Sequence, residues 1–202
     1  MFLQSPPHLI LASTSSYRRA LLARVHGSFE CVAPAIDETP LAGESGLALV
    51  SRLAHAKART VAQEHPEVWV IGSDQAAILL DARQQQEILG KPGTAQRCIG
   101  QLERCSGRTV AFLTAVAVVR FGEARSFEFV DTTRVTFREL DAPTIRRYVA
   151  RESPLDCAGG FKSEGLGISL CSSIDSDDPS ALIGLPLIRL CAVLREVGFE
   201  LP

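Results

Sequence analysis

The sequence predicts an α/β protein built on one mixed sheet that is flanked by helices. Two observations lead to this class: short apolar runs pass directly into helical segments, and two long runs rich in β-branched residues meet at a turn. Strand–helix units favour parallel pairing and hairpins give antiparallel pairing, so a chain with both is expected to form a mixed sheet. Because the 202 residues contain no repeat or linker, we expect a single domain over residues 1–202, with room for two lobes about a cleft.

The chain opens on a strand, a turn and a helix. Residues 8–12 form an apolar run that is too short for a helix, and small hydroxylated residues follow it, as at the end of a buried strand. Ser15 or Ser16 can cap the next helix, and Leu21 and Leu22 give that helix a face for the core.

The remaining elements are predicted from apolar spacing and from the positions of glycine and proline. In the first half we expect a strand over 28–32, a loop over 36–40, a helix over 44–65, a buried strand over 68–72 and another apolar segment over 76–80. In the second half we expect a turn over 81–86, a helix over 94–104, a hairpin of strands 109–121 and 124–137 joined at Gly122–Glu123, a helix over 141–151, an irregular glycine-rich segment over 157–169, and a helix over 182–197.

Charge and composition exclude several classes of protein. The net charge is −2, so no overall field favours a nucleic-acid polymer or a membrane surface as a partner. There is no charged leader with an apolar core, and no apolar run approaches the roughly 20 residues of a membrane span. The six cysteines form no CxxC pair, and the four histidines show no metal-ligand spacing. We therefore expect a cytoplasmic protein with reduced thiols.

The first turn and helix form a candidate phosphate site. Free backbone N–H groups at a helix start attract anions, and the hydroxyls of Ser13 and Ser15 can add hydrogen bonds. Arg18 and Arg19 place two permanent cations in the same turn, where they oppose the helix dipole unless an anion is present. An equally open alternative is that the serines only cap the helix and the arginines are solvated.

Asp74 follows a buried strand, at the carboxyl end where open α/β sheets bind ligands. Alone it could simply bond its own backbone in a turn. Glu38, however, adds a second carboxylate, and Lys57, Lys91 and Lys162 add cations in segments that could line a cleft. Two carboxylates with several cations suit a magnesium-dependent reaction on a polyphosphate.

Three rival chemistries lack their motifs. The sequence contains no GxxxxGK[ST] loop, no GxGxxG and no GxSxG. A P-loop nucleotidase, a dinucleotide-dependent enzyme of the usual type and a serine hydrolase are thereby disfavoured.

Six segments together resemble a known family in both order and spacing. They are Leu11–Arg19, Asp37–Pro40, Ile71–Gln75, Gly90–Pro92, Cys157–Gly165 and Gly184–Pro186. The chain resembles the Maf family, known also as septum-formation inhibitor proteins, over nearly its whole length. The resemblance implies the inosine-triphosphatase-like α/β fold, an elongated mixed sheet with two lobes about a central cleft.

The same resemblance implies a metal-dependent nucleoside triphosphate pyrophosphatase, for which we expect Mg²⁺ or Mn²⁺. A homodimer is a separate expectation, which the sequence does not decide. Ser73-Asp74-Gln75 and Phe161-Lys162-Ser163-Glu164-Gly165 are similar to the subgroup that acts on 7-methyl-GTP. The alternatives are the dTTP/UTP subgroup, a nucleotide-binding regulator of cell division with incidental hydrolysis, and a phosphatase that releases orthophosphate.

Carried over residue by residue, the resemblance makes Asp74 the proton acceptor, and it makes Tyr17, Gln75 and Glu164 the residues that set base specificity. An aromatic ring and a carboxylate suit 7-methylguanine, which is a cation with hydrogen-bond donors on its edge. Glu38 and Asp74 are expected to hold the metal. The cations Arg18, Arg19, Lys57, Lys91 and Lys162, with the hydroxyls of Ser13 and Ser15, are expected to bind the phosphates.

The chain departs from the family pattern in three places. Ser16 and Tyr17 stand where Pro and Trp are expected, and Gly160 replaces a common Ser. Asp81–Ala82 opens a longer turn than usual, which bears on the placing of Lys91. Tyr17 keeps an aromatic ring, so the subgroup is unchanged. Since Asp74 cannot be both a tight metal ligand and a strong base, one of these roles could belong to another carboxylate.

Overall fold

The structure is a computed structural model that describes residues 8–80, 85–123 and 125–202. Its seven strands form one sheet in the order β2-β1-β3-β5-β6-β7, and β4 pairs with β3 outside this path. The strands are β1 (Leu9–Ala12), β2 (Glu30–Cys31), β3 (Trp69–Leu80), β4 (Gln86–Leu89), β5 (Thr109–Val119), β6 (Ser126–Phe137) and β7 (Cys171–Asp175). Since β1 pairs in parallel with β2 and β3 while the other pairs are antiparallel, the predicted mixed sheet is confirmed.

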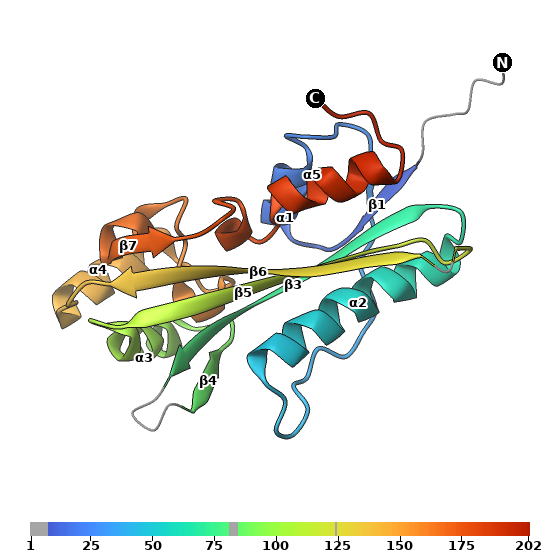
Figure 1. The fold of residues 1–202 in the computed structure, drawn as a ribbon. Coiled ribbons are helices and arrows are strands. Elements are labelled where there is room, and N and C mark those ends of the chain that lie inside the picture. Colours follow the sequence, from blue (N-terminus) through green and yellow to red (C-terminus); the bar gives the residue numbers. More distant parts are fainter. Residues whose placement is uncertain (1–7, 81–84, 124) are drawn as a thin grey trace, which may run out of the picture.

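Within the described residues, five α-helices and three 3₁₀ turns accompany the sheet, and Figure 1 shows how the helices lie around it. The helices are α1 (Ser16–Leu22), α2 (Gly46–Glu64), α3 (Ala95–Cys105), α4 (Ala142–Glu152) and α5 (Leu187–Glu196), and the 3₁₀ turns are η1 (Ala158–Gly160), η2 (Leu166–Leu170) and η3 (Ala181–Ile183). Ser15, Ser45, Thr94 and Asp141 cap the first four helices with their side chains. Within the described ranges, no helix is long and apolar enough to cross a membrane.

The two faces of the sheet are covered differently. On one face, α2 packs along β3 and β5, and α1 and α5 lie on the opposite face (Figure 1). Gly72 lets α2 approach closely, because a Cβ at that position would lie 2.1 Å from the carbonyl oxygen of Ala54. The face that carries α1 and α5 holds a second apolar cluster, built with α3 and α4 at the far end of the long strands. The core is thus divided along the strands, in keeping with the expected two lobes.

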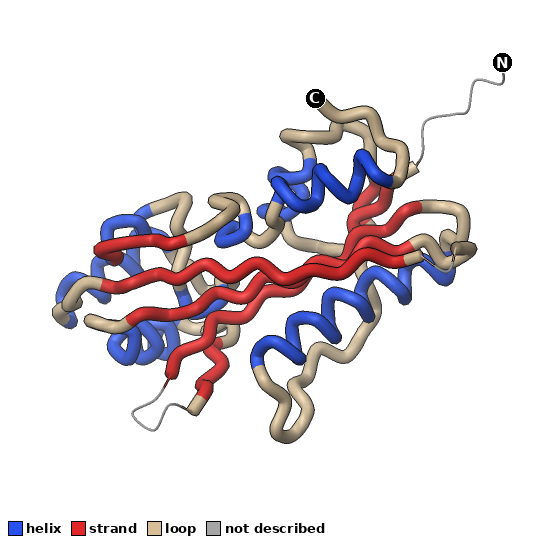
Figure 2. Tube along the Cα trace, viewed as in Figure 1, coloured by secondary structure: helices blue, strands red, loops and turns tan. Residues whose placement is uncertain are grey.

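Figure 2 shows the long strands running side by side between the two ends of the sheet. A gap in strand pairing lies along the edge of β3 that does not face β5. One edge of β3 pairs continuously with β5 from Val70 to Leu79. On its other edge, the pairing with β1 stops at Gly72 and that with β4 begins at Ala77. Within the described residues, positions 73–76 therefore have no strand neighbour on that edge, and Asp74 lies in the opening.

This arrangement corrects the expected place of Asp74. The predicted segments 68–72 and 76–80 are one continuous strand, β3, so Asp74 lies inside a strand and not after one. The antiparallel ladder to β5 carries the backbone straight through the polar Ser73-Asp74-Gln75. The strand whose carboxyl end meets this opening is β1, because its last paired residue, Ala12, lies opposite Gly72.

Several other boundaries differ from the predictions. The predicted strand over 28–32 shortens to the two residues of β2, and the irregular segment 157–169 contains η1 and most of η2. The last helix begins only at Leu187, because Pro186 is its N-cap residue and η3 forms a separate turn before it. The strands β4 and β7 were not predicted. The longer turn expected at Asp81–Ala82 lies outside the described residues.

Candidate active site

A cavity of about 630 Å³ opens at the gap in strand pairing. Its walls come from the β1–α1 turn, the loop before α2, α2 itself, the middle of β3, the loop after β4, the glycine-rich segment and η3. Ten of the predicted site residues line it: Ser13, Ser15, Tyr17, Arg18, Glu38, Lys57, Asp74, Gln75, Lys91 and Glu164. Seven chain segments thus meet at one place.

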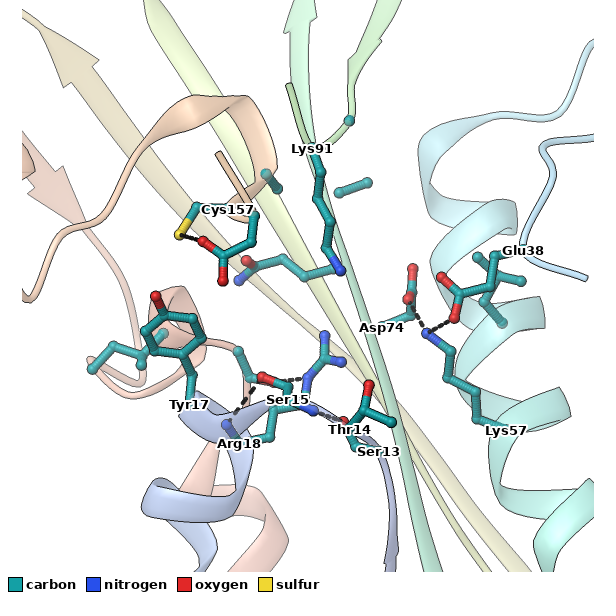
Figure 3. A pocket seen from close by; sticks show the side chains of 18 of the residues that line it. Ser13, Thr14, Ser15, Tyr17, Arg18, Glu38, Lys57, Asp74, Lys91 and Cys157 are labelled. Carbon is teal, nitrogen blue, oxygen red and sulfur yellow. Dashed lines mark hydrogen bonds and ion pairs between the residues drawn. The ribbon is translucent and has the colours of Figure 1, made fainter. Parts of the chain in front are cut away.

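Lys57 joins the two predicted carboxylates (Figure 3). Its Nζ lies 2.7 Å from Oδ1 of Asp74 and 2.9 Å from Oε1 of Glu38. The side chains of Lys57 and Asp74 are only 6% and 11% exposed, whereas that of Glu38 is 53% exposed. Alternation along β3 points Asp74 to the face that α2 covers, which is why a lysine on α2 can reach it.

The two carboxylates fit a divalent cation of the kind predicted. Mg²⁺ in proteins is commonly held by one or two carboxylates, with water and substrate phosphate completing its shell. Asp74 and Glu38 supply hard oxygen donors about one buried ammonium group, which compensates their charge. Among the described residues, no three His, Cys, Asp or Glu side chains form a complete metal site. A cation here would therefore depend on ligand oxygens from the substrate.

Arg18 enters the cavity from the first turn of α1 (Figure 3). Its Nε donates a 2.9 Å hydrogen bond to the carbonyl oxygen of Gly184. Burial lowers the pKa of the Arg18 guanidinium, and the charges of Asp74 and Glu38 oppose that shift. The positive charge of Arg18 is thus partly balanced by two carboxylates. An anionic ligand in the cavity would balance it further.

The two serines of the turn shape it through their side-chain oxygens. Ser15 Oγ accepts the backbone N–H of Arg18 at 3.4 Å, and Ser13 Oγ accepts the backbone N–H of Ser15 at 3.1 Å. Of the two predicted caps, Ser15 is the one that caps the helix, and Ser16 is the first residue of α1. A hydroxyl that accepts one bond still has a proton to donate, so both serines can also face a phosphate oxygen.

Two predicted phosphate-binding cations lie elsewhere. Arg19 is exposed, and among the described residues it does not line the cavity. Successive positions on a helix are rotated by about 100°, so Arg19 points away when Arg18 points into the cavity. Lys162 forms an ion pair with Glu152 at 3.0 Å, and its Nζ lies 5.6 Å from the ring centre of Tyr17. Lys162 thus lies against Tyr17, and among the described residues it does not line the cavity.

The wall opposite Asp74 carries an aromatic ring and acidic groups. Tyr17 and Cys157 lie across the cavity from Asp74, Lys57 and Glu38 (Figure 3). Burial raises the pKa of the Tyr17 hydroxyl, with further upward contributions from Cys157 and Asp156. Burial also raises the pKa of the Cys157 thiol to about 12, so this thiol is neutral at physiological pH.

Asp156 lines the same wall and was missed by the sequence reasoning. Its signal was weak, since an aspartate beside a glycine-rich segment is also a common turn residue. Asp156 and Glu164 both line the cavity, and the charge of Asp156 acts on the Tyr17 hydroxyl. A ligand with a cationic ring is therefore better suited to this wall than an anionic one.

Gln75 is already engaged by the protein. Its Nε2 donates to Oγ1 of Thr114 at 2.9 Å and lies 3.0 and 3.1 Å from the carbonyl oxygens of Ala181 and Leu182. An amide nitrogen has two protons, so these three acceptors account for its donor capacity. If Gln75 contacts a base, its oxygen must be the contacting atom.

The fold and the cavity define a class: an α/β protein with a charged cleft suited to a phosphate-bearing ligand that has a ring at its other end. The family model described as Maf-like protein matches residues 8–197. The chain belongs to the Maf family, which confirms the resemblance found in the sequence.

Relatives of this chain extend over nearly its whole length. One, named 7-methyl-GTP pyrophosphatase from Xanthomonas axonopodis pv. citri, is 53% identical over 196 residues and covers 97% of this chain and 100% of its own. Another of the same name, from Aromatoleum aromaticum, is 54% identical and covers 96% of this chain and 97% of its own. A weaker likeness links the structure to the Ham1 protein of Staphylococcus aureus, with a TM-score of 0.45, 14% identity, and coverage of 64% of this chain and 71% of that one.

Proposed function

We propose that this protein hydrolyses 7-methyl-GTP to 7-methyl-GMP and diphosphate, as a house-cleaning activity against modified nucleotides. The proposal is supported by relatives of that name at about half identity over nearly the full chain. The observation that carries it is the cavity itself, in which Asp74, Lys57 and Glu38 lie across from Tyr17, and which Arg18 and Glu164 also line (Figure 3).

The triphosphate is proposed to lie toward β3 and α2, and the base toward Tyr17. Arg18 and Lys91 line the phosphate side, together with the hydroxyls of Ser13 and Ser15. Methylation at N7 makes guanine a cation, so stacking on Tyr17 and hydrogen bonding to Glu164 both gain strength from the charge. Asp156 strengthens the same preference, since its carboxyl group lies on that wall.

In the proposed reaction, Asp74 accepts the proton of a water molecule that attacks the α-phosphorus. The bond between that phosphorus and the oxygen bridging to the β-phosphate breaks, and pyrophosphate leaves. Lys57 holds Asp74 in position and balances the charge of the two carboxylates. Arg18 and Lys91 stabilise the negative charge on the phosphate oxygens as the bond breaks.

A divalent cation, Mg²⁺ or Mn²⁺, is proposed as the cofactor. Of the two carboxylates predicted to hold it, Asp74 and Glu38, we propose that Glu38 would be the tighter ligand, because Asp74 acts as the base. Once bound, such a cation neutralises phosphate charge and polarises the phosphorus–oxygen bonds. We place the activity in the cytoplasm, with a small-molecule nucleotide as the partner and neither a nucleic-acid polymer nor a membrane. The homodimer stays a prediction, which light scattering of the purified protein would check.

The test is an assay of purified protein with 7-methyl-GTP, GTP, dTTP and UTP, each with Mg²⁺ and with Mn²⁺. Chromatography of the products distinguishes the alternatives. A preference for 7-methyl-GTP with release of pyrophosphate supports the proposal. Release of orthophosphate would make the protein a phosphatase, preference for dTTP or UTP would place it in the other subgroup, and tight binding with very slow turnover would favour a regulator.

A further inference from the structure

A row of polar side chains crosses the middle of the sheet, between the two apolar clusters of one face. Register places Gln75 of β3 beside Thr114 of β5, and Thr114 beside Asp131 of β6. All three lie between the cluster built with α1 and α5 and the cluster built with α3 and α4. The chain segment that covers this row is Asp178–Gly184, whose last residues line the cavity.

Thr114 is the centre of the contacts between the row and this segment. Its side chain is buried, with 1% exposed, and among the described residues it does not line the cavity. Its Oγ1 donates to the carbonyl oxygen of Ala181 at 3.0 Å and accepts from Nε2 of Gln75 at 2.9 Å. Gln75 also contacts the carbonyl oxygens of Ala181 and Leu182. Thr114 and Gln75 together hold η3 on the sheet.

The same segment ends at the carbonyl group that binds Arg18. The oxygen of Gly184 accepts from Arg18 Nε at 2.9 Å and from Ser73 Oγ at 3.0 Å. Gly184 has a φ of 125°, a conformation that other residues rarely adopt. A Cβ at this position would lie 3.4 Å from Arg18 Nε. The path of the backbone here determines where the Arg18 guanidinium is held.

The other end of the segment is fixed independently. Asp178 is 3% exposed, and its carboxylate accepts the backbone N–H groups of Ser180 at 2.9 Å and Ile188 at 2.7 Å. The stretch between Ser180 and Gly184 is therefore attached to the sheet through Thr114 and Gln75 on one side, and it meets Arg18 on the other. A change at Thr114 can therefore reach Arg18 through this segment, and it also removes one hydrogen bond of the cavity-lining Gln75.

We propose that Thr114 is a positioning residue for phosphate binding. Through Gln75 and the carbonyl groups of η3, it sets the position of the Gly184 carbonyl, and this carbonyl in turn orients Arg18 toward the phosphate chain. The inference rests on the proposed function only in taking Arg18 as a phosphate-binding group. It concerns no atom of the base, so a ligand without a base can test it.

The experiment measures binding of inorganic pyrophosphate, with Mg²⁺ present, by titration calorimetry. Thr114→Val keeps the shape of the side chain and removes its hydroxyl, whereas Thr114→Ser keeps the hydroxyl. We expect affinity to fall about tenfold in Thr114→Val and to stay within about twofold of wild type in Thr114→Ser. In an Arg18→Gln background, Thr114→Val should cause no further loss of affinity, because the effect of Thr114 is exerted through Arg18.

Three results would overturn the proposal. These are unchanged pyrophosphate affinity in Thr114→Val despite a lower melting temperature, an equal loss with and without Arg18, and absence of pyrophosphate binding by the wild type. If Thr114→Val does not fold, Thr114→Ala serves for the same comparison. The result is separable from the proposed function, because pyrophosphate binding is measured without turnover and without 7-methyl-GTP.

Discussion

Lys57 and Asp74 form a buried ion pair, with 2.7 Å between Nζ and Oδ1 and side chains that are 6% and 11% exposed. One residue comes from α2 and the other from the middle of β3, so the pair links the helix to the sheet at the cavity. Removing Lys57 would leave the charge of Asp74 buried without this partner, whereas removing the charge of Asp74 would leave Lys57 paired with Glu38. The pair is therefore important both for the fold and for the charge of the site.

Replacement of Lys57 by Met should destabilise the fold. We expect the free energy of unfolding to fall by about 3 kcal/mol, because Asp74 stays buried without its counter-charge. Adding Asp74→Asn to this variant should recover part of the loss while leaving the protein inactive. Urea unfolding measures both effects, and Arg59→Met, at an exposed position two residues further along α2, is the control. Equal stability of the Lys57 and Arg59 variants would contradict the prediction.

Arg18 and Arg19 should differ sharply, although they are neighbours in the sequence. Arg18→Gln removes a cation that lines the cavity, and we expect its kcat/KM for 7-methyl-GTP to fall about 100-fold. Arg19→Gln changes an exposed side chain, for which we expect less than about a twofold effect. Steady-state kinetics of the two variants gives the comparison. Similar losses in both would mean that the whole turn, and not Arg18, binds the phosphates.

Tyr17 should control preference for the methylated base. Tyr17→Leu removes the aromatic face, and we expect the ratio of kcat/KM for 7-methyl-GTP over GTP to fall about tenfold. Tyr17→Phe keeps the ring and should keep the ratio. A loss of equal size on both nucleotides would assign Tyr17 to general packing of the wall, with no part in recognising the charge of the base.

Asp131 should make stability depend on pH. It is 7% exposed, and its Oδ1 has no hydrogen-bond partner among the described residues. Burial raises its pKa above the usual 3.8, the charges of Asp178 and Asp177 add to the shift, and Arg189 opposes it. The folded state thus holds this proton more tightly than the unfolded chain, so stability falls as pH rises through the raised pKa.

Asp131→Asn removes this ionisation without changing the shape of the side chain. We expect its melting temperature at pH 7 to exceed that of the wild type by about 3 °C. The difference should disappear below pH 3.8, where the wild-type carboxyl group is protonated in both states. Calorimetry over this pH range measures the effect, and a constant difference at every pH would show that the charge is not its cause.

The fold was predictable where apolar periodicity is strong. The helices at 44–65, 94–104 and 141–151 and the long hairpin strands lie within a few residues of their predicted bounds. The strand β7 (Cys171–Asp175) could not be predicted, because it is a largely exposed edge strand without apolar alternation. The continuity of β3 was hidden as well, since its polar centre resembles the end of a strand while the pairing partner lies 40 residues away.

The site was predictable as a set of residue types and less so as a geometry. Asp74, Glu38, Lys57 and Arg18 were all expected, and they meet in one cavity. The sequence could not separate Arg18 from Arg19, because the rotation of a short helix about its axis depends on packing against distant residues such as Gly184. Contacts such as that of Thr114 with Ala181 are set by tertiary structure alone and leave no local pattern.

The variant Asp74→Asn tests whether Asp74 is the general base, with turnover and folding measured on the same preparation. The neutral amide can still accept from Lys57, which also keeps Glu38 as its partner, so we expect the melting temperature and nucleotide binding to be retained. We expect kcat for release of pyrophosphate from 7-methyl-GTP to fall by at least about 1,000-fold, as for loss of an essential general base. A folded Asp74→Asn variant with near-normal kcat would show that Asp74 is not the base.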